Sequence, residues 1–312
     1  MTGRWRRLGR VSLDTSRADW ASTHAALPVV EPLGDNRFGV YLSLRDDRNR
    51  ARIGRTTLTM GNAPVLAPLD PDPALDVGAL GAFDDSGVTT SCLVTTGRTR
   101  LLYYTGWTRG VTVPFYLAAG VAVSEGGGPF HRLSPAPLLD RSAVDPFLTA
   151  SPFVLIDQSR WRMWYVSGTE WRAQGPASAG SALLSTPRHY YHIRYAESRN
   201  GLTWKREGKV CLDYASAEEH AFARPWVIRD AGGYHMWFAV RGERYRIGYA
   251  HSREGEAWTR RDDLGLTASG ADWESQMVEY PCVFDWDGGR YMLYNGNDYG
   301  RSGVGMAVLE HG

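Results

Sequence analysis

A strand pattern that recurs five times along the chain limits the possible folds more than any other feature of the sequence. Each copy contains a small or polar residue, usually proline, followed by two or three apolar residues. The copies are HAALPVV (24–30), VTTSCLV (88–94), LTASPFV (148–154), AFARPWV (221–227) and MVEYPCV (277–283). The proline-like positions are Pro28, Cys92, Pro152, Pro225 and Pro281, at spacings of 64, 60, 73 and 56 residues. A recurring unit of this length indicates a repeat architecture.

Two further sets of strands follow each copy in a fixed order. The second set is apolar and turns polar at its ends: FGVYLSLR (38–45), RLLYYTGW (100–107), RMWYVSGTEW (162–171), HMWFAVRG (235–242) and YMLYNGND (291–298). The third set is RIGRTTL (52–58), AAGVAVSE (118–125), HIRYAES (192–198), YRIGYAHS (245–252) and GVGMAVLE (303–310). Five copies of three to four strands predict an all-β fold, a single five-bladed β-propeller domain over residues 1–312.

The last copy stops after its third strand, so its fourth strand has to come from elsewhere in the chain. Residues 5–11 (WRRLGRV) resemble residues 204–210 (WKREGKV), which follow the third strand of an earlier copy. We therefore expect the N-terminal strand to close the last blade, which removes a free sheet edge.

Charge and motif content exclude several classes of partner. The net charge is +1 and the arginines are scattered, so we expect no nucleic-acid partner and no anionic membrane surface. No apolar run reaches the length of a membrane span, and no apolar segment follows the basic N-terminus, so we expect a cytoplasmic protein. The absence of CxxC and HExxH spacings argues against zinc, and nothing implies an organic cofactor.

Side chains of the first strand in each blade point alternately toward the axis of a propeller, so polar residues there are candidate site residues. In four of the five copies a carboxylate lies seven positions before the proline-like residue: Asp85, Asp145, Glu218 and Glu274. Converging carboxylates suit glycosidic-bond chemistry, in which one carboxyl protonates the leaving oxygen and another activates water or attacks the anomeric carbon. Alternatively, such residues cap turns at strand entrances.

Other residues of these strands are candidates for substrate binding. The first strands contribute His24, Ser151, His220, Arg224 and Tyr280. The second strands end in residues expected to reach the same mouth, namely Arg45, Thr105, Trp107, Ser167, Trp171, Arg241, Asn295 and Asn297; of these we assign substrate binding to Arg45, Trp107, Trp171 and Asn295. Segment 169–190 predicts a lid or binding loop. An oxygen-rich axis would be compatible with Ca²⁺, although no metal ligands are assigned.

Over its whole length the chain resembles, at the level of repeats, the five-bladed propellers of glycoside hydrolase families 32, 43, 62 and 68. The resemblance is carried by the S-x-x-G-x-x-W turns at Ser198–Trp204 and Ser252–Trp258 and by the strands YHMWF, YMLYNGN, ARPWV and EYPCV. It is closest to uncharacterised glycosyl-hydrolase-like relatives. In these hydrolases an Asp precedes the proline-like position in blades one and two, and the general acid Glu lies in an E-x-P strand. Here Leu27, Ser91 and Ser151 occupy three of the corresponding places, and only Glu279-Tyr280-Pro281 keeps an E-x-P, in the fifth copy.

The resemblance implies a carbohydrate-active enzyme that hydrolyses or transfers a glycosyl unit with paired carboxylates. We expect Glu279 to be the acid and Asp85 or Asp145 the base or nucleophile, with Glu219 as a further carboxylate; Arg224, His24 and His220 would position the saccharide. Two alternatives remain. The fold could serve acid–base chemistry on a small biosynthetic metabolite (elimination, cyclisation or transfer), which the missing triad favours, or it could bind sugars without catalysis.

Overall fold

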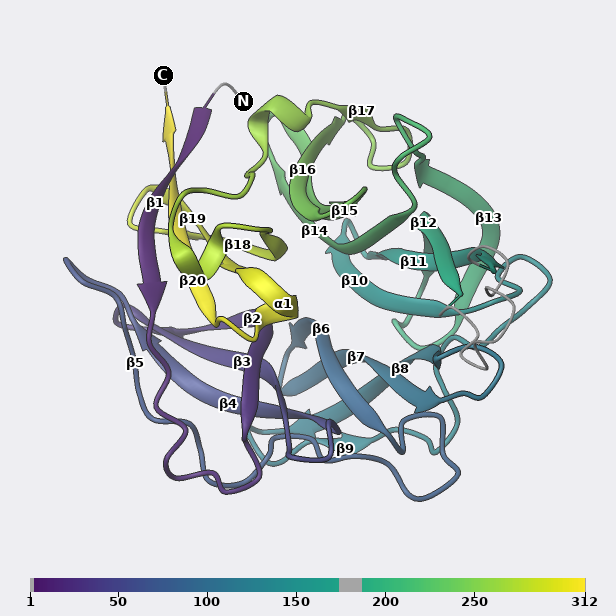
Figure 1. Cartoon of the computed structure of the whole chain (residues 1–312), viewed down its shortest axis with the longest axis horizontal. Coiled ribbons are helices and arrows are strands. Elements are labelled where there is room, and N and C mark those ends of the chain that lie inside the picture. The colour runs from purple at the N-terminus through teal and green to yellow at the C-terminus, as the bar shows by residue number, and fades with distance from the viewer. Residues whose placement is uncertain (1–2, 174–186, 312) are drawn as a thin grey trace, which may run out of the picture.

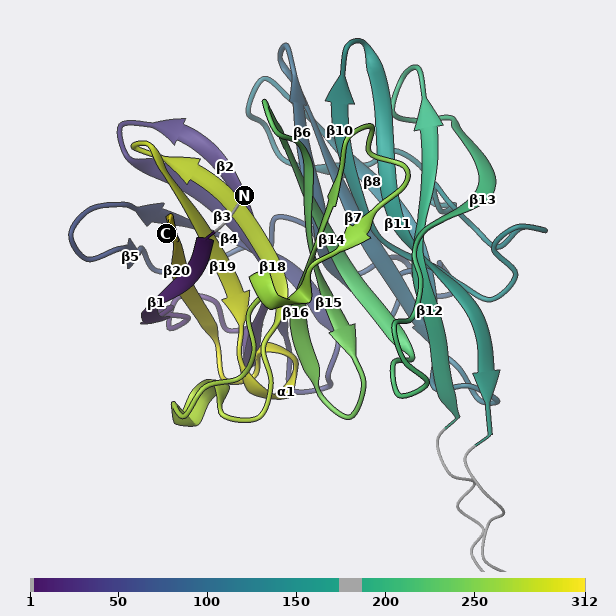
Figure 2. The ribbon, with the colours of Figure 1, turned by 90° about the horizontal axis from the view of Figure 1, so that it is seen from above.

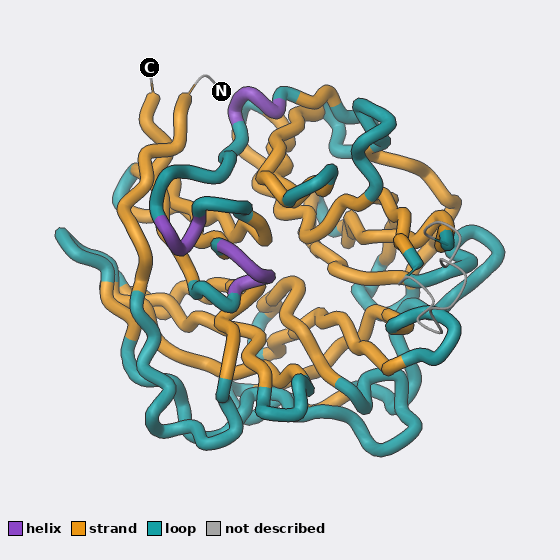
Figure 3. The backbone as a smooth tube through the Cα atoms, viewed as in Figure 1, coloured by secondary structure: helices purple, strands orange, loops and turns teal. Residues whose placement is uncertain are grey.

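The computed structural model describes residues 3–173 and 187–311, and strands make up most of it (Figures 1 and 3). The strands of the first half are β1 (Gly3–Val11), β2 (Thr23–Gly34), β3 (Arg37–Arg45), β4 (Ala51–Thr59), β5 (Val65–Leu66), β6 (Gly87–Thr96), β7 (Thr99–Arg109), β8 (Phe115–Glu125), β9 (His131–Arg132) and β10 (Thr149–Asp157). Those of the second half are β11 (Arg160–Arg172), β12 (Arg188–Ser198), β13 (Trp204–Leu212), β14 (Ala221–Asp230), β15 (Gly233–Arg241), β16 (Tyr245–Ser252), β17 (Thr259–Arg260), β18 (Glu279–Trp286), β19 (Gly289–Asn295) and β20 (Val304–His311). Each segment of the three repeated strand sets coincides with one of these strands, with ends that differ by at most four residues.

Neighbouring strands pair antiparallel and form three hydrogen-bonded sheets. One sheet has the order β1-β20-β19-β18. The second runs β2-β3-β4-β6-β7-β8-β9 with β5 on β4, and the third runs β10-β11-β12-β14-β15-β16-β17 with β13 on β12. Within each larger sheet a single parallel bridge joins the two halves, Ala51 to Gly87 in one and Tyr191 to Ala221 in the other. Figure 1 shows the sheets arranged around a common centre. The all-β prediction is confirmed, while the number of blades stays a prediction.

The N-terminal strand β1 lies beside the C-terminal strand β20, as the resemblance between residues 5–11 and 204–210 predicts. The two strands pair antiparallel from Gly3–His311 to Val11–Val304, and Figure 1 shows the two ends of the chain side by side. Trp5 in β1 is 7% exposed, and its ring meets that of Trp237 edge to face at 5.9 Å. The pairing therefore ties the start of the chain to the aromatic core.

Large aromatic side chains fill the space between the sheets. The second strand of each repeat is buried on both faces because it lies in the middle of its strand group, as β3, β7, β11 and β15 show. Trp164 and Trp237 are among the largest fully buried side chains, and Phe153 packs on Trp226 with ring centroids 4.9 Å apart. Most of the high aromatic content is thus used for packing on pleated surfaces.

Helical structure is confined to three short turns in the part of the chain that the structure describes. These are two 3-10 turns, Asp262–Leu264 and Asp272–Glu274, and the turn α1 (Asn297–Gly300), which lies at the lower end of the molecule in Figure 2. Within residues 3–173 and 187–311, no helix has the length and hydropathy of a membrane span.

Candidate functional site

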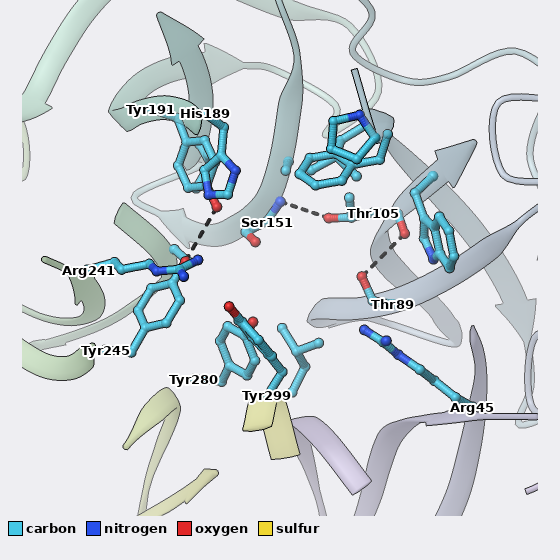
Figure 4. Close-up of a pocket in the computed structure, with 18 of the residues that line it drawn as sticks. Arg45, Thr89, Thr105, Ser151, His189, Tyr191, Arg241, Tyr245, Tyr280 and Tyr299 are labelled. Atoms are coloured by element: carbon cyan, nitrogen blue, oxygen red, sulfur yellow. Dashed lines mark hydrogen bonds between the residues drawn. The ribbon is translucent and has the colours of Figure 1, made fainter. Parts of the chain in front are cut away.

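A cavity of about 500 Å³ opens at the centre of the fold, between strands of all three sheets (Figure 4). Its wall contains three arginines (Arg45, Arg109 and Arg241), four tyrosines (Tyr191, Tyr245, Tyr280 and Tyr299), the hydroxyl residues Thr89, Thr105 and Ser151, and the aromatic rings of Trp107, Phe115 and His189. No Asp or Glu is among the described residues that line it. The cavity is therefore cationic, rich in hydroxyl groups and partly aromatic.

Irregular backbone in the first strand of each repeat shapes this wall. The residue before the proline adopts a left-handed conformation in four of them, with φ of 53° at Leu27, 47° at Ser151, 53° at Arg224 and 57° at Tyr280. The strand pairing slips at the same place, for example between Glu279 and Cys282. Proline suits such a bulge because it has no N–H to donate to the neighbouring strand. Left-handed non-glycine residues cost on the order of 1–3 kcal/mol each and gather at functional sites. Leu27, Ser151 and Tyr280 all line the cavity.

The turn α1 brings Tyr299 over the same opening. Asp298 and Tyr299 have φ of 56° and 58°, and the Asn297 side chain fixes the turn by accepting hydrogen bonds from the backbone N–H groups of Gln276 and Met277 at 2.9 and 3.1 Å. Tyr299 remains 37% exposed although it is a large aromatic residue. The turn thus holds an aromatic ring at the cavity mouth at a cost in backbone strain.

Hydroxyl groups on one side of the cavity form a connected set (Figure 4). The backbone N–H of Ser151 donates to Oγ1 of Thr105 at 2.8 Å, and Oγ1 of Thr89 donates to the carbonyl of Thr105 at 3.4 Å. Ser151 lines the cavity, and its hydroxyl makes no hydrogen bond within residues 3–173 and 187–311. These groups can exchange hydrogen bonds with ligand hydroxyls.

His189 is a neutral group in the cavity wall. Its ring stacks on Tyr191 at 4.7 Å and also contacts Phe115 and Trp171. Burial, followed by the charge of Arg241, lowers the pKa of His189 to about 3. At neutral pH the imidazole is therefore an uncharged hydrogen-bonding surface.

The stability of the protein is expected to fall as the pH drops from 6.5 toward 3, in part because of His189. An unfolded chain binds a proton at His189 below its ordinary pKa of 6.5, whereas the folded chain does so only near 3, so folding is penalised between these values. In urea unfolding at a series of pH values, His189→Gln should lose about 1 kcal/mol less per pH unit than the unsubstituted protein over this range. Equal slopes for the two proteins would contradict the assignment.

Glu279 lies immediately behind the cavity wall. It begins β18 and is fully buried; neither carboxyl oxygen makes a hydrogen bond of ordinary geometry with a described residue, while the Tyr280 side chain and the Tyr299 N–H lie near enough to lower the pKa of this carboxyl. Burial raises the pKa of Glu279 well above its usual value, and Arg241 and the Tyr280 side chain offset this only in part. Its carboxyl is close enough to influence the titration of Tyr191 and Tyr245, which line the cavity. The protonated form is thus favoured beside the site.

The other sequence-predicted carboxylates do not line the cavity. Asp145 is fully buried; it accepts a hydrogen bond from Ser167 at 2.6 Å and pairs with Arg194 and Arg206 at 3.2 and 2.8 Å. Asp85 lies in a partly exposed turn, where it accepts hydrogen bonds from the Gly81 N–H and the Ser86 hydroxyl.

Glu219 likewise pairs with arginines and does not line the cavity. It forms ion pairs with Arg246 and Arg260 at 2.6 and 2.7 Å. Burial by itself would raise the pKa of Glu219, but its hydrogen bonds with Arg260, the Ala215 N–H and Arg246 lower the pKa to about 2. Glu219 is therefore ionised and already neutralised by its partners.

A buried carboxylate clamped by arginine recurs in four of the repeats, and we call it the carboxylate clamp. Its members are Asp84 with Tyr104 and Arg132, Asp145 with Tyr165 and Arg206, Glu219 with Arg260, and Glu274 with Tyr294 and Arg7. The arginine comes from the fourth strand of each group, on β9, β13, β17 or β1. The clamp joins the first-strand entrance to the fourth strand and, in three of the four repeats, to a tyrosine of the second strand. Asp145 and Glu274 are two of the regularly spaced acidic residues; Asp84 and Glu219 are the neighbours of the other two.

The sequence-predicted binding residues are divided between the cavity and the packed interior. Arg45, Ser151, Tyr280 and Trp107 line the cavity. Trp171 lies next to it, in contact with the lining residues Phe115 and His189. His24 lines a separate depression near Arg10 and Arg301, and burial lowers its pKa to about 4.

Three other predicted binding residues are held inside the protein. His220 is buried against the carbonyl of His189 at 3.2 Å, and Asn295 is fully buried, accepting the Leu27 N–H at 2.8 Å. Arg224 is 1% exposed and donates to the carbonyls of Thr90 and Pro28 at 2.5 and 2.6 Å. It thus reaches from β14 across the centre to the first strands of two other repeats. Beyond it lies an apolar depression lined by residues that include Val30, Val154 and Trp226.

Sequence reasoning missed His189, Tyr191, Tyr245 and Tyr299 as site residues. Tyr191 and Tyr245 lie at the start of β12 and β16, and Arg241 at the end of β15 pairs directly with Tyr245. Because the second and third strands are antiparallel, the first residues of a third strand lie at the same end as the last residues of a second strand. The sequence could therefore have indicated Tyr191 and Tyr245 through this register. No sequence pattern indicated the left-handed turn that presents Tyr299. The greater part of the predicted lid, residues 174–186, is outside the described residues.

A divalent cation does not fit the donors at the cavity. The three guanidinium groups repel a cation, and no carboxylate among the described lining residues offsets them. The described residues also contain no group of three or more His, Cys, Asp or Glu able to hold a metal. The expectation that Ca²⁺ could bind at the axis gains no support from this geometry.

Solved structures similar to this fold include glycoside hydrolases. A glycosyl hydrolase of Bacteroides ovatus aligns with a TM-score of 0.69 at 11% identity, covering 99% of this chain and 94% of that one. A thermostable family-43 glycoside hydrolase aligns at 0.63 with 18% identity, covering 95% and 92%. A family-32 β-fructofuranosidase of Bombyx mori aligns at 0.64 with 13% identity, covering 93% of this chain and 62% of the enzyme. The predicted resemblance to these hydrolases is confirmed at the level of the fold.

Curated sequences give a much closer relationship. No family model matches the chain. The uncharacterised protein Rv1502 of Mycobacterium tuberculosis strain H37Rv is 43% identical over 308 residues, covering 98% of this chain and 99% of the relative, and the uncharacterised protein MT1551 of strain CDC 1551 matches equally well. The chain therefore belongs to the family of the mycobacterial protein Rv1502, on a fold shared with glycoside hydrolases.

Proposed function

We propose that the protein is a carbohydrate-active enzyme that cleaves or transfers a glycosyl unit in the central cavity. The observation that carries this proposal is the carboxyl of Glu279, which is fully buried, makes no hydrogen bond of ordinary geometry with a described residue and lies beside the cavity of a glycoside-hydrolase fold. A carboxyl whose pKa is raised by burial is suited to give a proton to a leaving oxygen.

In this proposal Glu279 is the source of the proton and Tyr280 passes it to the ligand. Tyr280 follows Glu279 in the chain, its side chain lies near that carboxyl, and its ring lines the cavity. The Tyr280 hydroxyl donates its proton to the glycosidic oxygen as the bond from that oxygen to the anomeric carbon breaks, and it receives the Glu279 proton. Water or an acceptor hydroxyl then bonds to the anomeric carbon and releases a proton, which restores Glu279. We assign no second carboxylate to this reaction, because the described lining residues include no Asp or Glu.

The Glu279→Gln variant should lose more turnover on substrates whose leaving group must be protonated than on substrates whose leaving group departs as an anion. On methyl glycosides the loss should reach about 10²- to 10⁴-fold, because the amide cannot supply a proton. On 4-nitrophenyl glycosides, whose leaving group departs without protonation, it should be much smaller. A panel of both types with several pyranose and furanose sugars, followed by mass spectrometry, makes the comparison.

The matched control is Asp85→Asn, which removes a charge from a surface turn and should leave both rates unchanged. Undiminished turnover in Glu279→Gln would eliminate the proposed proton source. An equal loss on both classes of glycoside would instead indicate a structural role for Glu279.

A second candidate is acid–base chemistry on a small biosynthetic metabolite. The observation favouring it is that no Asp or Glu occurs among the described lining residues, so the paired carboxylates of a standard glycosidase have no counterpart in the wall. Consumption of such a metabolite without addition of water, with no turnover of any glycoside, would support this candidate. Binding of sugars without any turnover would support a non-catalytic sugar-binding protein.

We also propose that the strands form five blades of a single propeller domain over residues 1–312. The pairings support this, since β2–β5, β6–β9, β10–β13 and β14–β17 each form a consecutive antiparallel group, and β18–β20 are completed by β1. A cytoplasmic location stays a prediction of the sequence.

A further inference from the structure

We propose that the ligand of the central cavity is a saccharide carrying an oxyanion, a phosphate or a carboxylate, and that Arg241 is its principal anchor with Arg45 opposite. This inference rests on the proposed function, because it names the substrate class of the same site. It starts from the charge balance of the cavity, which contains three guanidinium groups and no carboxylate among its described lining residues.

Several partly buried arginines elsewhere in the protein are neutralised by carboxylates, and the fully buried Arg224 is held instead by two backbone carbonyls. Arg52 pairs with Asp46 at 2.8 Å, and Arg246 and Arg260 pair with Glu219. Arg241 and Arg45, by contrast, form no ion pair with any carboxylate among residues 3–173 and 187–311. Glu279 forms no ion pair with either arginine, and burial raises the pKa of its carboxyl. Two partly buried cations without counterions are a costly arrangement unless an anion joins them.

The Arg241 side chain also donates no hydrogen bond to any residue in the described part of the chain. The guanidinium lies 5.4 Å from the centre of the Tyr245 ring and 5.8 Å from that of Tyr299, and these cation–π contacts hold it in place without satisfying its N–H groups. Figure 4 shows the group directed into the cavity, with the hydroxyls of Tyr191 and Tyr245 beside it. A planar fork of N–H donors flanked by hydroxyl donors suits the oxygens of a phosphate or carboxylate.

Arg45 approaches from the other side of the same cavity. Its Nη1 donates to Oδ1 of Asn49 at 2.8 Å, which fixes the side chain while leaving other N–H groups available. Burial lowers the pKa of Arg45, as expected of a cation that has been taken out of water without a counterion. In Figure 4 the hydroxyls of Thr89, Thr105 and Ser151 lie between the two arginines. Arg45 and Arg241, which suit an oxyanion, thus flank a set of protein hydroxyls that can hydrogen-bond to sugar hydroxyls.

The test compares each sugar with its charged counterparts on the full-length protein. Isothermal titration with glucose, galactose, mannose and fructose, their phosphates, glucuronate, galacturonate and inorganic phosphate gives the preference for charge. We expect at least one anionic sugar to bind about 10- to 100-fold more tightly than its neutral form, because hydrogen bonds to charged groups have that strength. Added salt should weaken this preference. Phosphates and uronates in separate arms identify the source of the oxyanion.

Arg241→Gln should abolish most of the preference, and Arg45→Gln should reduce it. The matched control is Arg253→Gln, an exposed arginine just past the far end of β16, which removes the same charge away from the cavity and should keep the preference. Equal affinity for neutral and anionic sugars, failure of every anionic compound to bind, or an unchanged preference in Arg241→Gln would each overturn the inference.

The failure of this inference can be distinguished from failure of the proposed function. Turnover of neutral glycosides that depends on Glu279, without any preference for charge, would refute only the anionic ligand. Tight, Arg241-dependent binding of an anionic sugar that is never turned over would refute only the catalytic proposal.

Discussion

Replacing Asp145 with alanine is expected to lower the free energy of unfolding by about 3–5 kcal/mol, the usual result of removing one partner from a buried ion pair. The substitution leaves Arg194 and Arg206 without their shared counterion; their side chains are only 14% and 18% exposed. The hydroxyls of Tyr165 and Ser167 lose their acceptor as well. The midpoint of thermal unfolding should fall by roughly 10 °C in calorimetry.

The control for this experiment is Asp85→Ala, the neighbouring repeat's aligned acidic residue in a partly exposed turn. It should cost no more than about 1 kcal/mol, the worth of an ordinary hydrogen bond. The comparison also separates two roles for Asp145. If Asp145→Ala kept its stability but lost ligand turnover, the carboxylate would belong to the catalytic site and not to the carboxylate clamp.

Replacing Trp5 with alanine is expected to destabilise the protein by about 3–5 kcal/mol, as for other buried tryptophans. Trp5 is the point where β1 is inserted into the core, next to Trp237, and its loss would loosen the pairing of β1 with β20. Chemical denaturation measures the effect. Because a detached β1 exposes the edge of β20, light scattering during unfolding should also rise earlier in the variant.

Leu8→Ala is the matched control, since Leu8 lies on the same strand but is 39% exposed. It should change the free energy of unfolding by less than about 1 kcal/mol. If both substitutions had the same small effect, β1 would be a peripheral strand that contributes little to the core.

The repeat order of the strands could be predicted because each repeat places similar residue types at the same positions of its strands. The match of residues 5–11 to 204–210 predicted the pairing of β1 with β20 in this way. The regular acidic positions were also a real signal, but they marked the carboxylate clamp. In two repeats the buried member of the clamp is not the aligned residue itself but its neighbour: Asp84 beside Asp85, and Glu219 beside Glu218.

Residues that serve one site, in contrast, need not recur in every repeat. Arg45 and Arg241 end equivalent strands, yet nothing in their local sequence distinguishes a free arginine from one paired with a carboxylate. Tyr299 depends on a left-handed turn fixed by Asn297, a tertiary contact made with residues about twenty positions earlier. Such features follow from three-dimensional neighbours, which sequence periodicity does not report.

Arg224, which reaches across the centre of the fold, fills with its side chain part of the space between the first strands of three repeats. Its guanidinium holds carbonyl oxygens of β2 and β6, and the depression beyond it is apolar. A polymer threaded through the centre of the protein would have to break the hydrogen bonds of Arg224. The terminus of a chain, or a molecule small enough to fit within about 500 Å³, could reach the innermost groups of the cavity without that cost.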